Sequence, residues 1–332
     1  MIKSGFEYLV PESLSDAYDF KKKHEEAAYI GGGTDYIPLL KYDLKKPETI
    51  ISLGKIMELK KIEADEKGMF IGSMVTLEEI HENRFVIDSF QSLARAAQSV
   101  ASPQIRNMGT IGGNILQDRR CMYFNQSEDW RSNLASCFKI GGSICHQAPK
   151  SEVCRALYYS DIAPVLLSLD AEAEIYDGEL IRMPVSHLIK SHIERNGRIK
   201  TNDFILKGFY IPYLPEDSWA KFGKYSLRAS IDFPAMNIAA RYSKREESCI
   251  VRIIAGAVSP VPIELNDIES MIVNHLDKLE EYKKDIVEGA LSELTKKSCL
   301  IRETGISINA KRNAFKNILR MTDGLISAII KK

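Results

Sequence analysis

The chain has 332 residues, of which 45% are hydrophobic, and this is enough apolar material for folded cores rather than a disordered chain. Lysine and arginine together number 45, as do aspartate and glutamate, so the formal net charge is zero. This balance argues against a nucleic-acid binder or a membrane-surface binder, because both depend on a basic excess. The first residues lack the apolar core of a signal peptide, and no apolar run approaches the ~18 residues of a membrane span, so we expect a cytoplasmic protein.

The N-terminal part of the chain has the pattern of a βαβ unit. Its predicted elements are, in chain order, a helix over 13–25 capped by Ser13 or Ser15, a buried strand over 27–30, a helix over 34–41 that begins at Thr34, and a strand over 50–53. Strands that are joined through a helix in this way are parallel neighbours. The sequence therefore predicts a small parallel layer.

The remainder mixes strands and helices without an internal repeat. The predicted elements are, in chain order, a hairpin of 60–63 and 69–71, a helix from Thr76, an amphipathic helix over 86–101, an apolar core segment over 162–169, strands over 171–176, 204–211, 221–225 and 249–258, and helices over 277–296 and 310–331. Prolines and acidic residues at 212–219 indicate a domain boundary. We interpret the chain as α+β, with two subdomains before about residue 215 and one domain after it.

Two glycine loops are candidate binding sites for a phosphate-bearing cofactor. The first consists of Gly31, Gly32, Gly33, Thr34 and Asp35, and the second of Gly109, Thr110, Ile111, Gly112, Gly113 and Asn114. Glycine lets an anion approach the backbone, and a helix N-terminus supplies free N–H groups. Neither loop has the G-x-G-x-x-G pattern of a Rossmann nicotinamide site. From the residues alone, a dinucleotide site and a plain tight turn both remain open.

Four of the six cysteines, Cys121, Cys137, Cys145 and Cys154, follow the second glycine loop. Thiolates select zinc or iron–sulfur clusters over harder ions, and clustered cysteines in a reducing compartment indicate metal or catalysis more than disulfides. The close C-x2–4-C pairs of structural zinc sites are missing. The spacing leaves open an iron–sulfur cluster, zinc and unligated thiols, and we interpret His146 as a neighbouring surface residue. Cys249 and Cys299 are interpreted as packed, inert thiols.

Four stretches resemble one known family. They are IGGGTDYIPLLK (30–41), SPQIRNMGTIGGNI (102–115), SDIAPVLLSLDAE (160–172) and FGKYSLRASIDFPAMNIA (222–239). Together they resemble the FAD-binding medium subunit of molybdenum hydroxylases, a family that includes the flavin subunits of xanthine dehydrogenase and aerobic carbon monoxide dehydrogenase. In most members a short link joins the second and third stretches. Here the inserted stretch 118–156 resembles the branch typified by the β subunit of 4-hydroxybenzoyl-CoA reductase, in which the insertion carries a [4Fe–4S] cluster.

This resemblance implies a fold and a set of site residues. The fold is a vanillyl-alcohol-oxidase-like (PCMH-type) FAD-binding domain over 1–215, with subdomains of about 1–56 and 57–215, followed by a C-terminal α+β domain over 216–332 like that of carbon monoxide dehydrogenase flavoproteins. The implied FAD contacts are Ile30, Gly31, Gly32, Gly33, Thr34, Asp35, Tyr36, Val100, Ala101, Gly109, Thr110, Ile111, Gly112, Gly113, Asn114, Asp161 and Lys224. The implied ligands of the [4Fe–4S] cluster are Cys121, Cys137, Cys145 and Cys154.

The resemblance also implies a role in electron transfer. The chain would relay electrons between an external carrier, its cluster, FAD and a partner [2Fe–2S] subunit, while a large molybdopterin subunit would hold the substrate, so that no catalytic residue is assigned to this chain. A dimer of heterotrimers and reduced ferredoxin as the donor are expected. The alternative within the family is a purine or N-heterocycle dehydrogenase that passes electrons from FAD to NAD. The alternative outside it is a zinc-stapled binding module without redox chemistry.

Overall fold

The protein is described by a computed structural model that covers residues 2, 5–192, 203–244, 249–302 and 306–331. Its contacts divide the chain into two compact units. The first unit consists of Met1–Glu79, Pro103–Ala156 and Asp170–Pro212, and the second of Ile80–Ser102, Leu157–Leu169 and Tyr213–Lys332. Each unit therefore draws on three separate segments of the chain.

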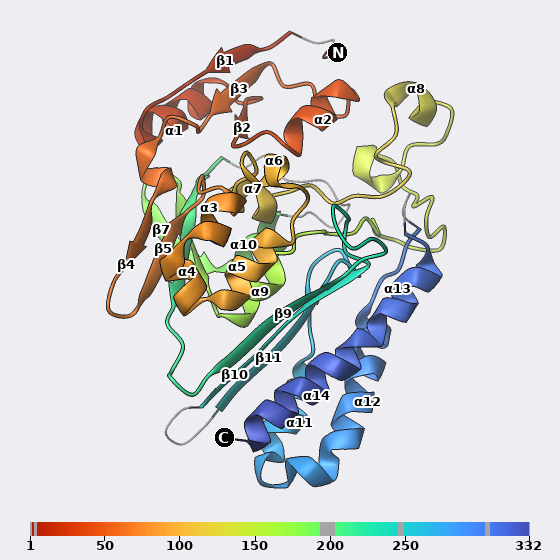
Figure 1. Ribbon diagram of the computed structural model, residues 1–332. Helices are drawn as coiled ribbons and strands as arrows, with labels where there is room; N and C mark the ends of the chain where they lie inside the picture. Colours follow the sequence, from red (N-terminus) through yellow and green to blue (C-terminus); the bar gives the residue numbers. More distant parts are fainter. Residues whose placement is uncertain (1, 3–4, 193–202, 245–248, 303–305, 332) are drawn as a thin grey trace. The chain divides into compact units, whose positions relative to one another are not determined.

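The elements of the first unit include a parallel sheet and an antiparallel sheet (Figure 1). They are β1 (Glu7–Leu9), α1 (Leu14–Lys23), β2 (Ala28–Ile30), α2 (Tyr36–Lys41), β3 (Thr49–Ser52), the 3-10 helix η1 (Met57–Lys60), β4 (Ile62–Ala64), β5 (Gly68–Gly72), α3 (Leu77–Glu82, which continues into the second unit), α6 (Pro103–Arg106), α7 (Ile111–Ile115), α8 (Glu128–Arg131), the 3-10 helix η2 (Phe138–Ile140), β6 (Glu172–Tyr176), β7 (Leu180–Pro184), α10 (Val185–His192) and β8 (Ile205–Pro212).

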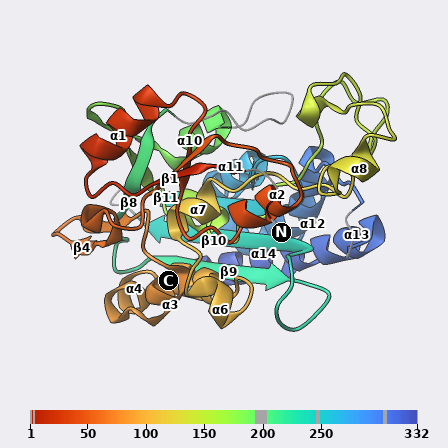
Figure 2. The same ribbon diagram turned by 90° about the horizontal axis from the view of Figure 1, so that it is seen from above.

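The three-stranded sheet of this unit has the order β1-β3-β2, and both pairs are parallel. The predicted parallel layer is therefore confirmed, with β1 as an additional strand that the sequence patterns did not indicate. The five-stranded sheet has the order β4-β5-β8-β6-β7 and is antiparallel. Ile51, Ile56 and Leu59 are fully buried in a core between α1 and the residues that follow β3. The segment around α8 contains little regular structure (Figure 2).

The second unit is built on a four-stranded antiparallel sheet with the order β12-β11-β10-β9. Its elements are α4 (Arg84–Ser89), α5 (Gln91–Gln98), α9 (Ala163–Ser168), β9 (Trp219–Tyr225), β10 (Met236–Lys244), β11 (Cys249–Gly256), β12 (Ile263–Glu264), α11 (Asn266–Asn274), the 3-10 helix η3 (Leu276–Lys278), α12 (Leu279–Lys297), α13 (Ile308–Phe315) and α14 (Asn317–Ile330). Helix α9 packs on β10 and β11, α5 packs on β9, and α12 and α14 lie side by side along the sheet (Figure 1). Residues of β10, β11, α12 and α14 share one apolar core.

Two predicted helices differ from the structure, and several elements besides β1 were missed, of which β10 is the longest. The helix predicted over 86–101 is two helices, because the chain leaves the helical conformation at Phe90, where φ is −138° and ψ is 57°. The helix predicted over 310–331 is also two helices, which meet at Lys316, although this residue keeps helical dihedrals with φ of −58° and ψ of −17°. The long strand β10 was not predicted. It contains alanines, which have low strand propensity, although apolar and polar residues alternate along most of it and the polar ones, Asn237, Arg241 and Ser243, are buried as well. The division into domains at residue 215 stays a prediction.

Among the helices of the described ranges, none is both long and apolar enough to cross a membrane.

Candidate functional site

The first glycine loop, which we define as Gly31–Asp35, has free hydrogen-bond donors. It follows β2 directly and leads into α2. Gly33 has φ of +73°, a left-handed conformation that suits glycine and turns the chain into the helix. Within the part of the chain that the structure describes, the backbone N–H groups of residues 32–35 donate no hydrogen bond to another protein group. A run of such donors before a helix can bind an anion.

The second glycine loop, Gly109–Asn114, lies directly against the first. A Cβ placed on Gly32 would lie 1.5 Å from the carbonyl oxygen of Met108, and one on Gly31 would lie 3.1 Å from Oγ1 of Thr110. No side chain fits at Gly32. The sequence predicts that Gly32 lets a phosphate approach the backbone, and in the structure this glycine also makes the contact between the two loops.

The second loop uses most of its own N–H groups and so differs from the first. Ile111 N–H donates to the carbonyl of Val75, and Gly112 N–H to that of Ser73. Thr110 caps α7 by accepting from the N–H of Gly113 through its side chain. These bonds fix the loop on the residues that follow β5. The expectation that both loops present free N–H groups is therefore met by the first loop but not by most of the second.

The remaining predicted contacts in the first unit flank the first loop. Ile30 is buried at the end of β2, and Tyr36 begins α2. Burial raises the pKa of Tyr36 to about 12, so its hydroxyl is neutral and can donate a hydrogen bond at physiological pH. Asp35 is paired with Arg120, which directly precedes Cys121. This ion pair joins the first glycine loop to the inserted stretch 118–156, which we call the cysteine segment.

In the second unit, the structure brings Asp161 and Lys224 together. Lys224 Nζ lies 2.8 Å from Asp161 Oδ2 and also donates to the carbonyl of Ser99 at 2.7 Å. The side chains are 4% exposed for Asp161 and 11% exposed for Lys224, so Lys224 is not a surface residue. Val100 and Ala101 follow Ser99, and Ala101 has φ of +44°, an uncommon conformation for a residue with a side chain.

Asn237 completes this group and was missed by the sequence analysis. It is fully buried on β10, and its Nδ2 donates to Asp161 Oδ1 at 2.7 Å and to the carbonyl of Ser160 at 3.1 Å. Burial raises the pKa of Asp161 and is the largest effect, while the Lys224 ammonium and the hydrogen bonds that Asp161 accepts from Lys224 and Asn237 act in the opposite direction. The only sequence signal for Asn237 was its position in the stretch 222–239. The carboxylate is therefore already held by two donors from the protein.

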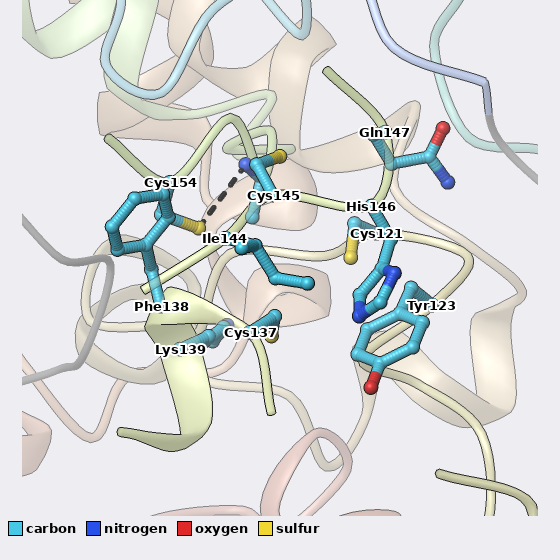
Figure 3. Close-up of a pocket in the computed structure, with 11 residues that line it drawn as sticks. Cys121, Tyr123, Cys137, Phe138, Lys139, Ile144, Cys145, His146, Gln147 and Cys154 are labelled. Carbon is cyan, nitrogen blue, oxygen red and sulfur yellow. Dashed lines mark hydrogen bonds between the residues drawn. The ribbon is translucent and has the colours of Figure 1, made fainter. Parts of the chain in front are cut away.

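The four clustered cysteines line a single pocket in the first unit. Cys121, Cys137, Cys145 and Cys154 are buried, with exposed fractions between 6% and 9%, and all four line the pocket. Figure 3 shows their side chains arranged around Ile144. None of them forms a disulfide. The chain thus brings together thiols that are widely spaced in sequence, while Cys249 and Cys299 do not line the pocket.

A tight turn holds two sides of this pocket together. Phe138 N–H donates to the carbonyl of Ile144, and Gly142 N–H to that of Cys137. Gly141 has φ of +94°, and a Cβ on Gly142 would lie 1.7 Å from the carbonyl oxygen of Ser136. The Gly141-Gly142 pair is therefore required by the turn that positions Cys137.

Backbone N–H groups are directed at the cysteine sulfurs. Phe124 N–H donates to Cys121 Sγ at 3.2 Å, and Ala156 N–H to Cys154 Sγ at 3.5 Å, the bond dashed in Figure 3. Burial raises the pKa of Cys121 to about 12, against the effects of the Phe124 N–H and the Lys139 ammonium. Burial also raises the pKa of Cys137. The thiols of Cys121 and Cys137 are therefore protonated at neutral pH, and metal binding would have to release their protons.

Tyr123, His146 and Lys139 are among the other residues that line the pocket. Tyr123 and His146 stack with ring centroids 4.0 Å apart, and both contact the carbonyl oxygen of Ala135. His146, which we expected from the sequence to be a surface residue beside the cysteines, therefore lines the pocket. Lys139 is buried and paired with Asp118. No sequence pattern indicates this lysine, because its partner lies 21 positions away in the chain.

The pocket offers four thiol sulfurs as possible metal ligands. Among the described residues, no group of three or more His, Cys, Asp or Glu side chains is arranged to hold one metal ion. A single zinc requires four ligands at about 2.3 Å from one centre. A pocket with four thiols and N–H groups directed at sulfur matches the donor set of a larger iron–sulfur cluster.

Comparison with known proteins identifies the family. The family described as "FAD binding domain in molybdopterin dehydrogenase" matches residues 4–214. The nicotinate dehydrogenase FAD-subunit of Eubacterium barkeri is 36% identical over 112 residues, which are 33% of this chain and 38% of that protein. The aldehyde oxidoreductase FAD-binding subunit PaoB of Escherichia coli (strain K12) is 34% identical over 154 residues, which are 45% of this chain and 48% of that protein. The chain thus spans less than half the length of these two curated relatives.

Solved structures show the same fold along the chain. The carbon monoxide dehydrogenase from Hydrogenophaga pseudoflava that lacks the Mo-pyranopterin moiety contains a chain that superposes with a TM-score of 0.76 at 17% identity, covering 99% of both chains. The predicted α+β fold of the carbon monoxide dehydrogenase flavoprotein type is therefore confirmed. With the match over 4–214, the chain belongs to the family of FAD-binding domains of molybdopterin dehydrogenases.

Proposed function

We propose that this chain is the FAD- and [4Fe–4S]-containing electron-transfer subunit of a molybdenum-containing oxidoreductase. Family membership supports the flavin part of this proposal. The observation that carries the cluster part is the gathering of four buried cysteines around one pocket. When bound to this chain, FAD would exchange one or two electrons and the cluster one electron. This combination suits a relay between different electron carriers.

The first glycine loop is proposed to hold the FAD diphosphate. The free N–H groups of residues 32–35 offer donors to phosphate oxygens, and the N-terminal end of α2 adds partial positive charge. The second loop supports the first through its contact at Gly32. We propose that Val100, Ala101, Asp161 and Lys224 also contact FAD, as the family resemblance implies.

The cysteines are proposed to bind the cluster through four thiolates. The N–H bonds to Cys121 and Cys154 stabilise negative charge on sulfur and thereby favour ligation over the neutral thiol. Burial of all four side chains keeps water from the bound group. Both features belong to the chain itself.

The finer assignment is a 4-hydroxybenzoyl-CoA reductase-like role in the cytoplasm. Reduced ferredoxin would donate electrons, and a small [2Fe–2S] subunit and a large molybdopterin subunit would complete a dimer of heterotrimers. The cysteine segment supports this assignment, because it is the feature that the resemblance connects with that branch.

An N-heterocycle dehydrogenase that passes electrons to NAD is the second candidate. It is favoured by the 36% identity with the nicotinate dehydrogenase FAD-subunit. The two functions differ in the external carrier. The complex purified under anaerobic conditions should be reduced by reduced ferredoxin and not by NADH if the reductase assignment is right, and fast bleaching of the flavin by NADH would support the dehydrogenase instead.

A further inference from the structure

A buried ion pair lies beside the cysteine pocket. Lys139 lines the pocket, and its side chain is only 3% exposed. Its Nζ lies 2.5 Å from Asp118 Oδ1, donates to the carbonyl of Arg119, and sits 4.1 Å from the centroid of the Phe124 ring. These contacts fix the ammonium in one place.

The pair is asymmetric with respect to the thiols. Lys139 is among the residues of the described chain that line the pocket, whereas Asp118 is not. Figure 3 shows Lys139 next to Cys137. The positive end of the pair is therefore the nearer one to the four sulfurs. A buried ion pair gives little net stability compared with apolar residues of the same volume, so stability alone does not explain a lysine at this position.

We infer that the fixed positive charge of Lys139 raises the reduction potential of the iron–sulfur cluster in this pocket. The inference rests on the proposed function, because it requires the cluster. Four thiolates and a cubane carry net negative charge, and reduction adds one electron to it. A fixed positive charge in a poorly solvated site stabilises the reduced form more than the oxidised form. Asp118 moderates the effect from a greater distance.

The test is the cluster potential in four proteins, measured by redox titration followed by electron paramagnetic resonance. D118N leaves the lysine without its counter-charge, and K139M leaves the carboxylate without its partner. The double variant D118N/K139M has neither charge, so it keeps no unpaired buried ion. The expected order of potentials, from highest to lowest, is D118N, the parent, D118N/K139M and K139M. A purely structural role for the pair gives no such opposite shifts from its two members.

Lys150 provides the matched control, since it lies between two of the cysteines in sequence but is exposed. K150M should leave the potential at the parent value, because water screens an exposed charge. Equal potentials in the parent and D118N/K139M, with the cluster bound in both, would overturn this inference alone. Loss of the cluster from both K139M and D118N/K139M would assign Lys139 a structural role and overturn it as well. A parent protein without iron would contradict the proposed function and the inference together.

Discussion

The carbonyl oxygen of Met108 occupies the space that any side chain at Gly32 would need, 1.5 Å from the position of its Cβ. This contact joins the two glycine loops of the first unit into one structure. It gives the triple glycine a role that exists before any cofactor binds. Within the described chain, the N–H groups of residues 32–35 in the first loop donate no hydrogen bond to another protein group.

The change G32A therefore tests whether the contact between the two loops requires a glycine at this position. We expect a loss of about 2–4 kcal/mol in the free energy of unfolding and loss of bound FAD, because Met108 must move to admit the methyl group. Urea denaturation and the flavin absorbance of the purified protein measure both effects. Gly5 is the control, since a Cβ there meets nothing within 4 Å. A G32A protein that unfolds like G5A and keeps FAD would show that the two loops do not touch in this way.

The ion pair of Asp161 and Lys224 predicts a specific pattern of stability. K224M removes the ammonium and leaves a carboxylate that is 4% exposed, at an expected cost of about 3–5 kcal/mol. D161N/K224M should recover most of this loss. K221M changes an exposed lysine of the same strand and should have little effect. Equal stability of K224M and K221M in urea would contradict the buried pair.

Lys224 is also expected to affect the flavin. A positive charge near the flavin favours its anionic reduced form, so K224M should lower the flavin potential in a redox titration, while K221M should not. An unchanged potential in K224M would remove Lys224 from the proposed FAD contacts.

The cysteine pocket predicts that iron binding depends on four of the six cysteines. C137S should lose its iron, whereas C249S should retain it, because Cys249 does not line the pocket. FAD should stay bound in C137S, since the free donors at residues 32–35 lie outside the cysteine segment. Metal analysis and flavin absorbance of the same samples give both values. Simultaneous loss of iron and FAD would indicate coupling of the two sites through the pair of Arg120 and Asp35.

Glu269 predicts a pH dependence of stability. Its carboxylate is buried, accepts the N–H of Ile253 at 2.7 Å, and has a pKa raised by burial from 4.5 to about 7. The folded chain therefore holds a proton that the unfolded chain releases between these values. The stabilisation is complete below pH 4.5 and is lost as the pH rises through 7. Relative to E269Q, the parent should lose about 2 kcal/mol of stability between pH 5 and pH 8.

Urea denaturation of the parent and E269Q at the two pH values checks this prediction. E280Q, which changes an exposed glutamate on α12, should follow the parent. Parallel pH profiles of the parent and E269Q would show that Glu269 is ionised throughout.

Local patterns were sufficient to predict the parallel layer and the glycine loops, because a strand, a triple glycine and a helix follow one another directly in the sequence. They failed where distant residues decide the outcome. Strand β10 is buried along most of its length, and its polar residues Asn237, Arg241 and Ser243 are buried by segments distant in sequence. Asn237 and Asp161 meet across 76 positions, and Lys139 and Asp118 across 21, and spacing alone indicates neither pair.

The most direct test of the central claim is the cofactor content of the chain purified without oxygen. The proposed function predicts about four iron atoms and about four acid-labile sulfides for each non-covalently bound FAD. It also predicts a yellow-brown protein from which acid precipitation releases the flavin. A colourless protein that contains zinc and neither iron nor flavin would contradict it.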